Sequence, residues 1–196
     1  DASVGWLWLS GLSLTALTFL MAKRWQIVAR SVEIDISYSR AVAEYYIAQL
    51  VNLVLPGGVV GDVTRAVRAR HAGDMARAAQ SVAADRIVGQ VVMFAVLGAG
   101  LVVALLLPGG IAWPAFAWGG CAGGVAVIAG AGVLSRQTGA AGQFATLILR
   151  LIQNLSILGL SLIITTLLIF SLYACARATG TVIPPAGWLT LIPLTL

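Results

Sequence analysis

Long apolar runs alternate with short polar stretches along the chain, and several runs approach the length of a bilayer-crossing helix. A helix needs about 20 predominantly apolar residues to cross a hydrocarbon core of about 30 Å. We therefore expect an all-α fold, a polytopic integral membrane helical bundle. The runs predict membrane spans at about 4–21, 87–107, 111–134 and 155–176, with the start of a further span at 188–196.

Composition supports a membrane protein. The chain is 60% hydrophobic and 10% charged, with a mean hydropathy of +0.97, whereas a soluble domain carries about 25% charged residues. Lipid must cover its surface, which predicts a multi-pass protein of the cell (plasma or inner) membrane. The net charge of +5 does not indicate a nucleic-acid partner, because Lys and Arg gather in the cytoplasmic loops of membrane proteins. The chain begins at Asp1 and stops at Leu196 within an apolar run, so we interpret it as a fragment.

Aromatic and basic residues flank the first apolar run. Trp6 and Trp8 lie at one end of Val4–Met21, and Lys23-Arg24-Trp25 follows the other end. We interpret both groups as interfacial anchors.

Two segments differ from plain spanning helices. Ala140–Asn154 carries polar residues on one helical stripe and apolar residues opposite, which predicts an amphipathic helix at the membrane interface or extending the next span. The run 111–134 contains two overlapping pairs of glycines spaced by four, which favour close helix packing and self-association as a homo-oligomer. A substrate path lined by glycine backbone is the alternative. These glycines are Gly119, Gly120, Gly123 and Gly124.

Cys121 and Cys175 lie in or at the end of apolar runs and have no metal-ligand or redox spacing, so we expect both to pack between helices. We expect no metal, no cofactor and no catalytic residue.

The segment 41–55 is apolar but short. Its 15 or so residues reach only about 22 Å as a helix, less than the hydrocarbon core. Pro56-Gly57-Gly58 follows, and these residues favour a chain reversal. If 41–55 crossed fully, the basic residues would divide five to seven between the two sides. If it enters and returns, they divide eleven to one, as the positive-inside rule prefers. We therefore expect a re-entrant helix at 41–55.

A cytoplasmic helical segment is expected at 62–86. Asp62 can cap a first short helix, and Gly73-Asp74 can separate it from a second one that continues into the span at 87.

Polar residues gather around the expected reversal. Tyr45, Gln49 and Asn52 share one helical stripe, which either faces a substrate or bonds neighbouring helices and the interrupted backbone. The helix start at Gly61-Asp62, with Arg65 one turn on, offers N–H donors and a guanidinium to a phosphate. Asp62 can instead pair with Arg65, and a basic surface that only fixes topology is a further alternative.

The pattern resembles the lysylphosphatidylglycerol synthase transmembrane (flippase-like) family. The resemblance rests on Arg24-Trp25, Gln49-x-x-Asn52-x-x-x-Pro56, Gly61-Asp62-x-x-Arg65 and Asp85-Arg86. It implies a polytopic fold with re-entrant helices, a lipid-accessible cavity and action on lipids. The family often has two glycines directly before the Asp, whereas Val60 precedes Gly61 here. The chain shows no soluble aminoacyl-transferase domain.

Together these observations predict a non-enzymatic domain that binds or translocates membrane lipids: an anionic or aminoacylated phospholipid, or a polyprenyl-linked lipid. The alternatives are a small-solute transporter and a non-catalytic membrane partner of a lipid-modifying enzyme. The predicted lipid-binding residues are Tyr45, Gln49, Asn52, Pro56, Gly61, Asp62, Arg65, Asp85 and Arg86.

Overall fold

The computed structural model describes residues 3–55, 59–70, 74–106 and 115–181, and every regular element in these ranges is an α-helix. This confirms the predicted all-α fold. The helices are α1 Val4–Ser31, α2 Tyr38–Val54, α3 Val60–Ala69, α4 Met75–Leu106, α5 Ala115–Leu134, α6 Ala140–Gln153 and α7 Leu155–Ala178. The predicted reversal at Pro56 and the predicted helix start at 188–196 lie outside the described residues.

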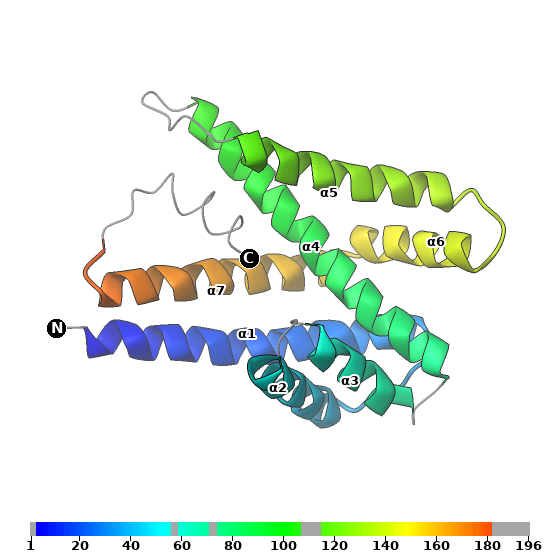
Figure 1. Cartoon of the computed structure of the whole chain (residues 1–196), viewed down its shortest axis with the longest axis horizontal. Helices are drawn as coiled ribbons and strands as arrows, with labels where there is room; N and C mark the ends of the chain where they lie inside the picture. The colour runs from blue at the N-terminus through cyan, green and yellow to red at the C-terminus, as the bar shows by residue number, and fades with distance from the viewer. Residues whose placement is uncertain (1–2, 56–58, 71–73, 107–114, 182–196) are drawn as a thin grey trace.

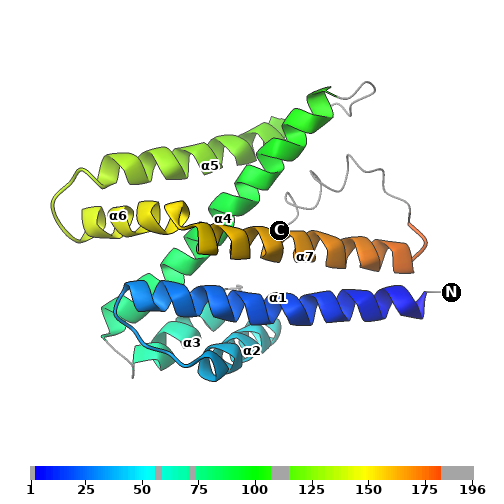
Figure 2. The same cartoon turned by 180° about the vertical axis from the view of Figure 1, so that it is seen from behind.

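Within the described ranges, three helices are long and apolar enough to cross a bilayer: Val4–Ser31, Met75–Gly100 and Leu155–Ala178. Two of them, α1 and α7, lie side by side and run antiparallel (Figure 1; the reverse view is Figure 2). At one end the backbone N–H of Ser3 donates to the carbonyl of Ala178 at 3.0 Å. Further along the pair, Arg24 Nη1 donates to Ser161 Oγ at 3.2 Å. The two helices therefore pack together over most of their length.

Helix α1 continues well beyond the predicted end at Met21, as far as Ser31. Arg24 and Trp25 are 4% and 0% exposed, so the prediction that they anchor the helix at the lipid interface was wrong. Their polar atoms have partners on α4: Arg24 Nε donates to Asp85, and Trp25 Nε1 donates to Ser81 Oγ. Partners on a neighbouring helix let a charged residue lie inside the bundle.

Helices α2 and α3 form an antiparallel hairpin. Near its tip, Asn52 Oδ1 accepts a hydrogen bond from the Gly61 backbone N–H at 2.7 Å. At its base, Glu44 on α2 pairs with Arg68 on α3 at 2.6 Å. The chain thus forms one hairpin, in which the two helices point in opposite directions.

Helix α2 crosses α1 at a wide angle. Tyr38 and Gln49 are separated by about 16 Å along α2 at 1.5 Å per residue. Both nevertheless reach the same turn of α1, where Tyr38 Oη donates to the Phe19 carbonyl and Gln49 Nε2 donates to Thr18 Oγ1. The depth of this hairpin in a bilayer remains a prediction.

Helix α4 runs without a break from Met75, as the sequence predicted for the second short helix and the span that follows it. It crosses α1 and α7 obliquely, as both ribbon views show (Figures 1 and 2). Of the glycines on α5, Gly124 packs on α4, since an added Cβ would lie 2.6 Å from Phe94 Cβ. Among the described residues, a Cβ at Gly119 or Gly123 would meet nothing within 4 Å, so these two glycines make no close helix contact there.

Helix α6 buries one face and leads directly into α7. Its Ile148 and Leu151 join a core cluster with Val28 of α1 and Ile157 of α7. Asn154 separates the two helices and caps α7, accepting from the Ser156 N–H at 3.0 Å. Arg150 is exposed on the polar side, and the interfacial placement of α6 stays a prediction.

Candidate functional site

Asp85 lies at the centre of a buried cluster that four helices build. Its Oδ1 accepts from Arg24 Nε at 2.9 Å, and its backbone carbonyl accepts from Arg24 Nη2 at 3.2 Å. Its Oδ2 accepts from the Tyr45 hydroxyl and lies 3.5 Å from Arg65 Nη2. Helices α1, α2, α3 and α4 are therefore joined through one carboxylate.

Arg65 is enclosed by aromatic rings. Its guanidinium carbon lies 4.7 Å from the ring centroid of Trp25 and 4.3 Å from that of Tyr45. The residue is 1% exposed, and its Nε is buried without a hydrogen-bond partner among the described residues. Stacking on aromatic faces stabilises a desolvated guanidinium. Burial, and then the charge of Asp85, raises the pKa of the Tyr45 phenol, which keeps the phenol protonated as a donor.

Asp62 links the buried cluster to the surface. Its Oδ1 lies 3.5 Å from Arg65 Nη2, so the predicted pairing of these two residues is present in the structure. Its Oδ2 is closer to another partner, Arg86 Nε, at 2.6 Å. The predicted capping role was wrong, because α3 begins at Val60 with Val59 at its N-cap and without a side-chain cap. Asp62 lies in the first turn, where a carboxylate complements the helix dipole.

The polar stripe of α2 is used between helices. Tyr45 bonds Asp85 on α4, Gln49 bonds Thr18 on α1, and Asn52 bonds the Gly61 backbone on α3. Of the two alternatives that the sequence left open for this stripe, the structure shows the one in which it bonds neighbouring helices and backbone. The remaining predicted site residue, Pro56, lies outside the described residues.

Gly61 allows α3 to approach the backbone of α2. A Cβ at this position would lie 2.2 Å from the Ala48 carbonyl oxygen, much closer than atoms can approach. The glycine of the Gly-Asp step therefore serves close helix packing, and it offers its own N–H to Asn52.

Sequence reasoning left several members of this site out. Arg24 and Trp25 were in the family pattern but were assigned to the interface, and nothing singled out Gly89. A Cβ at Gly89 would lie 3.0 Å from both terminal nitrogens of Arg24. Glu44 is 3% exposed and pairs with Arg68. The hydrogen bond that Arg68 donates to Glu44, and then the negative charge of Glu44, raise the pKa of Arg68. The signal that could have found Arg24 was a charged residue directly preceding a Trp in an otherwise helical run.

A cavity of about 260 Å³ lies between α1, α4 and α7, beside the cluster. Its polar lining residues are Arg24, Arg86, Gln90 and Thr165, and the other residues that line it are apolar apart from Gly89.

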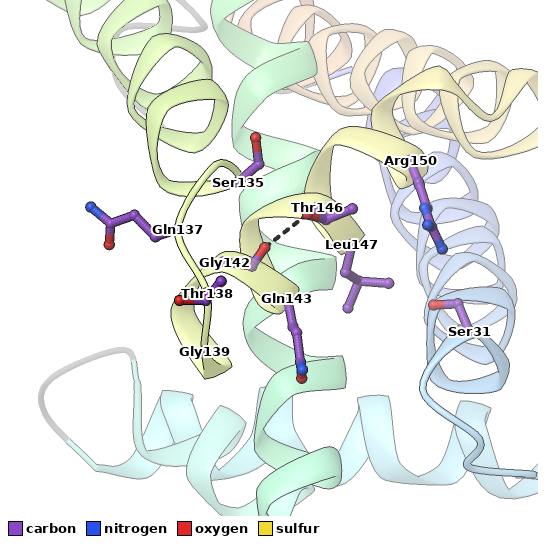
Figure 3. A pocket seen from close by; sticks show the side chains of 10 residues that line it. All are labelled: Ser31, Ser135, Gln137, Thr138, Gly139, Gly142, Gln143, Thr146, Leu147 and Arg150. Atoms are coloured by element: carbon purple, nitrogen blue, oxygen red, sulfur yellow. Dashed lines mark hydrogen bonds between the residues drawn. The ribbon is translucent and has the colours of Figure 1, made fainter.

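A second hollow, of about 560 Å³, lies at the corner between α5 and α6 and against the end of α1 (Figure 3). It is lined mainly by polar side chains, among them Ser31, Gln143, Thr146 and Arg150, while Gln137 points away from it. Thr146 Oγ1 donates to the Gly142 carbonyl at 2.8 Å on its wall. The sequence did not predict this hollow as a site.

The described residues include three long apolar helices, and a buried ionic cluster joins two of them, α1 and α4. These features define a multi-pass helical membrane protein. The chain belongs to the family described as the lysylphosphatidylglycerol synthase TM region, whose model matches residues 1–196. No curated protein and no solved structure matches the chain significantly. Family and fold together support a membrane lipid-related role.

Proposed function

We propose that this chain binds a membrane lipid and moves it between the two leaflets, as a flippase-like domain without catalytic residues of its own. The observation that carries the proposal is the ionic cluster around Asp85, which α1 and α4 hold inside the bundle. Charged side chains inside a membrane bundle are costly, and they commonly mark the path of a substrate. The family assignment favours a lipid as that substrate.

The surroundings of the cluster favour an amphiphile over a small polar solute. A small-solute path would need polar side chains along several spans. Helix α7 instead exposes large apolar residues such as Leu162, Ile163 and Phe170, and the cavity beside the cluster is mainly apolar. A lipid has both a charged group for the cluster and a chain for the apolar wall.

The test is a translocation assay with the purified protein in liposomes that contain fluorescent phosphatidylglycerol. A membrane-impermeant reductant quenches the label in the outer leaflet only. We expect a reconstituted protein to expose the inner-leaflet label to quenching, while protein-free liposomes retain about half of their fluorescence. Asp85→Asn should slow the process, because it removes the carboxylate that Arg24 and Arg65 share. A protected fraction equal to that of protein-free liposomes would refute translocation.

A further inference from the structure

The hollow at the corner between α5 and α6 has a polar wall that the proposed lipid function does not use. It lies against Ser31 at the end of α1, on the side of the membrane that the positive-inside rule predicts to be cytoplasmic. Its volume of about 560 Å³ falls within the range of small-molecule sites, about 300–1,000 Å³. Among the described residues that line it, Leu147 alone has a large apolar side chain. The hollow therefore suits a water-soluble ligand better than an acyl chain.

The polar stripe of α6 forms one wall of this hollow. Gln143, Thr146 and Arg150 lie at i, i+3 and i+7, so they project from the same side of the helix. The opposite side is buried in the core, where Ile148 packs. Figure 3 shows Arg150 pointing toward Ser31 on the end of α1. The stripe that makes α6 amphipathic thus faces a hollow between helices.

Arg150 gives the hollow a positive charge. No acidic side chain is among the described residues that line it. The Arg150 guanidinium forms no ion pair or hydrogen bond with any residue that the structure describes, so all its N–H donors are available. A guanidinium presents these donors in a plane that matches two oxygens of a phosphate. The hollow therefore favours an anion with paired oxygens.

Three hydroxyl groups on the wall have already used their hydrogens. Ser31, Ser135 and Thr146 each donate to a carbonyl three or four residues earlier in the chain, at 2.6 to 2.9 Å. A hydroxyl has one hydrogen and two lone pairs, so while these bonds hold each oxygen can only accept from a ligand. The ligand must therefore supply donors. Cationic N–H donors would be repelled by Arg150, which leaves hydroxyl groups as the fitting donors.

We infer that this hollow binds a small, water-soluble sugar phosphate, with its phosphate on Arg150 and its hydroxyl groups on Ser31, Ser135 and Thr146. The amide of Gln143 adds both a donor and an acceptor. A ligand held in this way joins the corner between α5 and α6 to the end of α1. The hollow shares no residue with the ionic cluster around Asp85, so the inference stands apart from the proposed lipid function.

Calorimetry with the purified protein in a sugar-free neutral detergent tests the inference. The probes are glucose 6-phosphate, glucose, inorganic phosphate and dihexanoylphosphatidylinositol. We expect glucose 6-phosphate to bind about tenfold or more tightly than glucose or phosphate, because it supplies both the charge and the hydroxyl groups. Equal affinity for glucose would overturn the role of the charge, and equal affinity for phosphate would reduce the hollow to a site for free anions. Tighter binding of the lipid would show that the hollow recognises a lipid headgroup instead. Absence of saturable binding of glucose 6-phosphate would overturn the inference.

Arg150→Gln should lower the affinity for glucose 6-phosphate about tenfold or more, because it removes the one charged group of the wall. Arg136→Gln is the matched control, since Arg136 is near the same corner and exposed but does not line the hollow. Both side chains are exposed, so neither change should disturb folding. An equal loss for the two variants would show diffuse electrostatic attraction and overturn the site.

Two further substitutions test the neutral groups. Gln143→Leu should lower the affinity for glucose 6-phosphate several-fold, whereas Gln137→Leu should leave it unchanged, because Gln137 points away from the hollow (Figure 3). Thr146→Val should weaken glucose 6-phosphate binding and leave phosphate binding unchanged, because it removes an acceptor for the sugar. Equal effects of the two Gln variants would exclude this hollow. An equal loss of phosphate binding by Thr146→Val would contradict the placement of the sugar. Liposomes that fail to translocate lipid would refute the proposed function and leave this site in place.

Discussion

Asp85 on α4 and Arg24 on α1 are 61 residues apart in the sequence and form a buried ion pair, with Nε and Oδ1 separated by 2.9 Å. Their side chains are 1% and 5% exposed. Arg65 reaches the second oxygen of the same carboxylate from α3. One acidic side chain thus neutralises basic groups from two other helices and fixes how these helices cross.

Replacing Asp85 by Ala should be strongly destabilising. The change leaves Arg24 and Arg65 buried near each other without their shared counter-charge, and losing one partner of a buried pair costs about 3–5 kcal/mol. Thermal unfolding in detergent, followed by size-exclusion chromatography after heating, measures the loss. Asp35→Ala is the matched control, since Asp35 is 89% exposed and its pair with Arg30 should contribute at most about 1 kcal/mol. Similar small losses for both variants would contradict the central role of Asp85.

Arg65→Lys should fail to replace Arg65, although it keeps the charge. A Lys ammonium lacks the flat guanidinium face that Trp25 and Tyr45 cover. We expect a loss of about 2 kcal/mol, the size of a desolvated cation–π contact. The same stability assay would show little change for Arg70→Lys, because Arg70 is exposed. Equal stability of Arg65→Lys and wild type would show that charge alone matters at this position.

Gly61→Ala should disturb the hairpin of α2 and α3. The added methyl group would lie 2.2 Å from the Ala48 carbonyl oxygen, and relieving this overlap must separate the helices and weaken the bond from the Gly61 N–H to Asn52. Overpacking of this kind costs about 1–3 kcal/mol.

Gly123→Ala on α5 is the matched helical control. Its added methyl group meets nothing within 4 Å, so the higher helix propensity of Ala should leave stability unchanged or raise it by up to about 1 kcal/mol. Thermal unfolding of the two variants under the same conditions makes the comparison. Equal destabilisation would show that the contact with Ala48 does not set the tolerance at Gly61.

The sequence predicted the parts of this molecule that depend on local pattern. Apolar length identified the helices, and spacing along α2 placed Tyr45, Gln49 and Asn52 on one stripe. The family pattern contained Arg24, Arg65 and Asp85 but not their contacts, because pairing over 61 residues depends on how the helices cross. Helical periodicity places residues around one helix and does not tell which neighbour each of them meets.

The same limit explains the wrong assignments. Arg24 and Trp25 follow an apolar run, which is also where interfacial anchors occur. Only the position of α4 shows that Asp85 and Ser81 receive them inside the bundle. The cavity between α1, α4 and α7 depends on the same crossing and therefore left no pattern in the sequence.

The last prediction concerns topology: Ser39, at the start of α2, and Arg70, just after α3, lie on the same side of the membrane. The hairpin contacts support this, because Arg40 Nη2 donates to the Arg68 carbonyl at 3.4 Å, which brings the start of α2 beside the end of α3. Arg177, in the last turn of α7, is the one basic residue expected on the other side of the membrane. The positive-inside rule therefore predicts that Ser39 and Arg70 face the cytoplasm.

Single cysteines at Ser39 and Arg70, introduced after Cys121 and Cys175 are replaced, would be probed with a membrane-impermeant thiol reagent in intact cells and in inverted vesicles. Both positions are exposed, so access depends on the side of the membrane. We expect both to react in inverted vesicles only. Thr179→Cys, at the opposite end of α7, is the control and should react in intact cells. Labelling of Arg70→Cys from outside, with Ser39→Cys protected, would mean that the chain crosses the membrane between α2 and α3, and the hairpin that holds Tyr45 and Arg65 against Asp85 would have to be rejected.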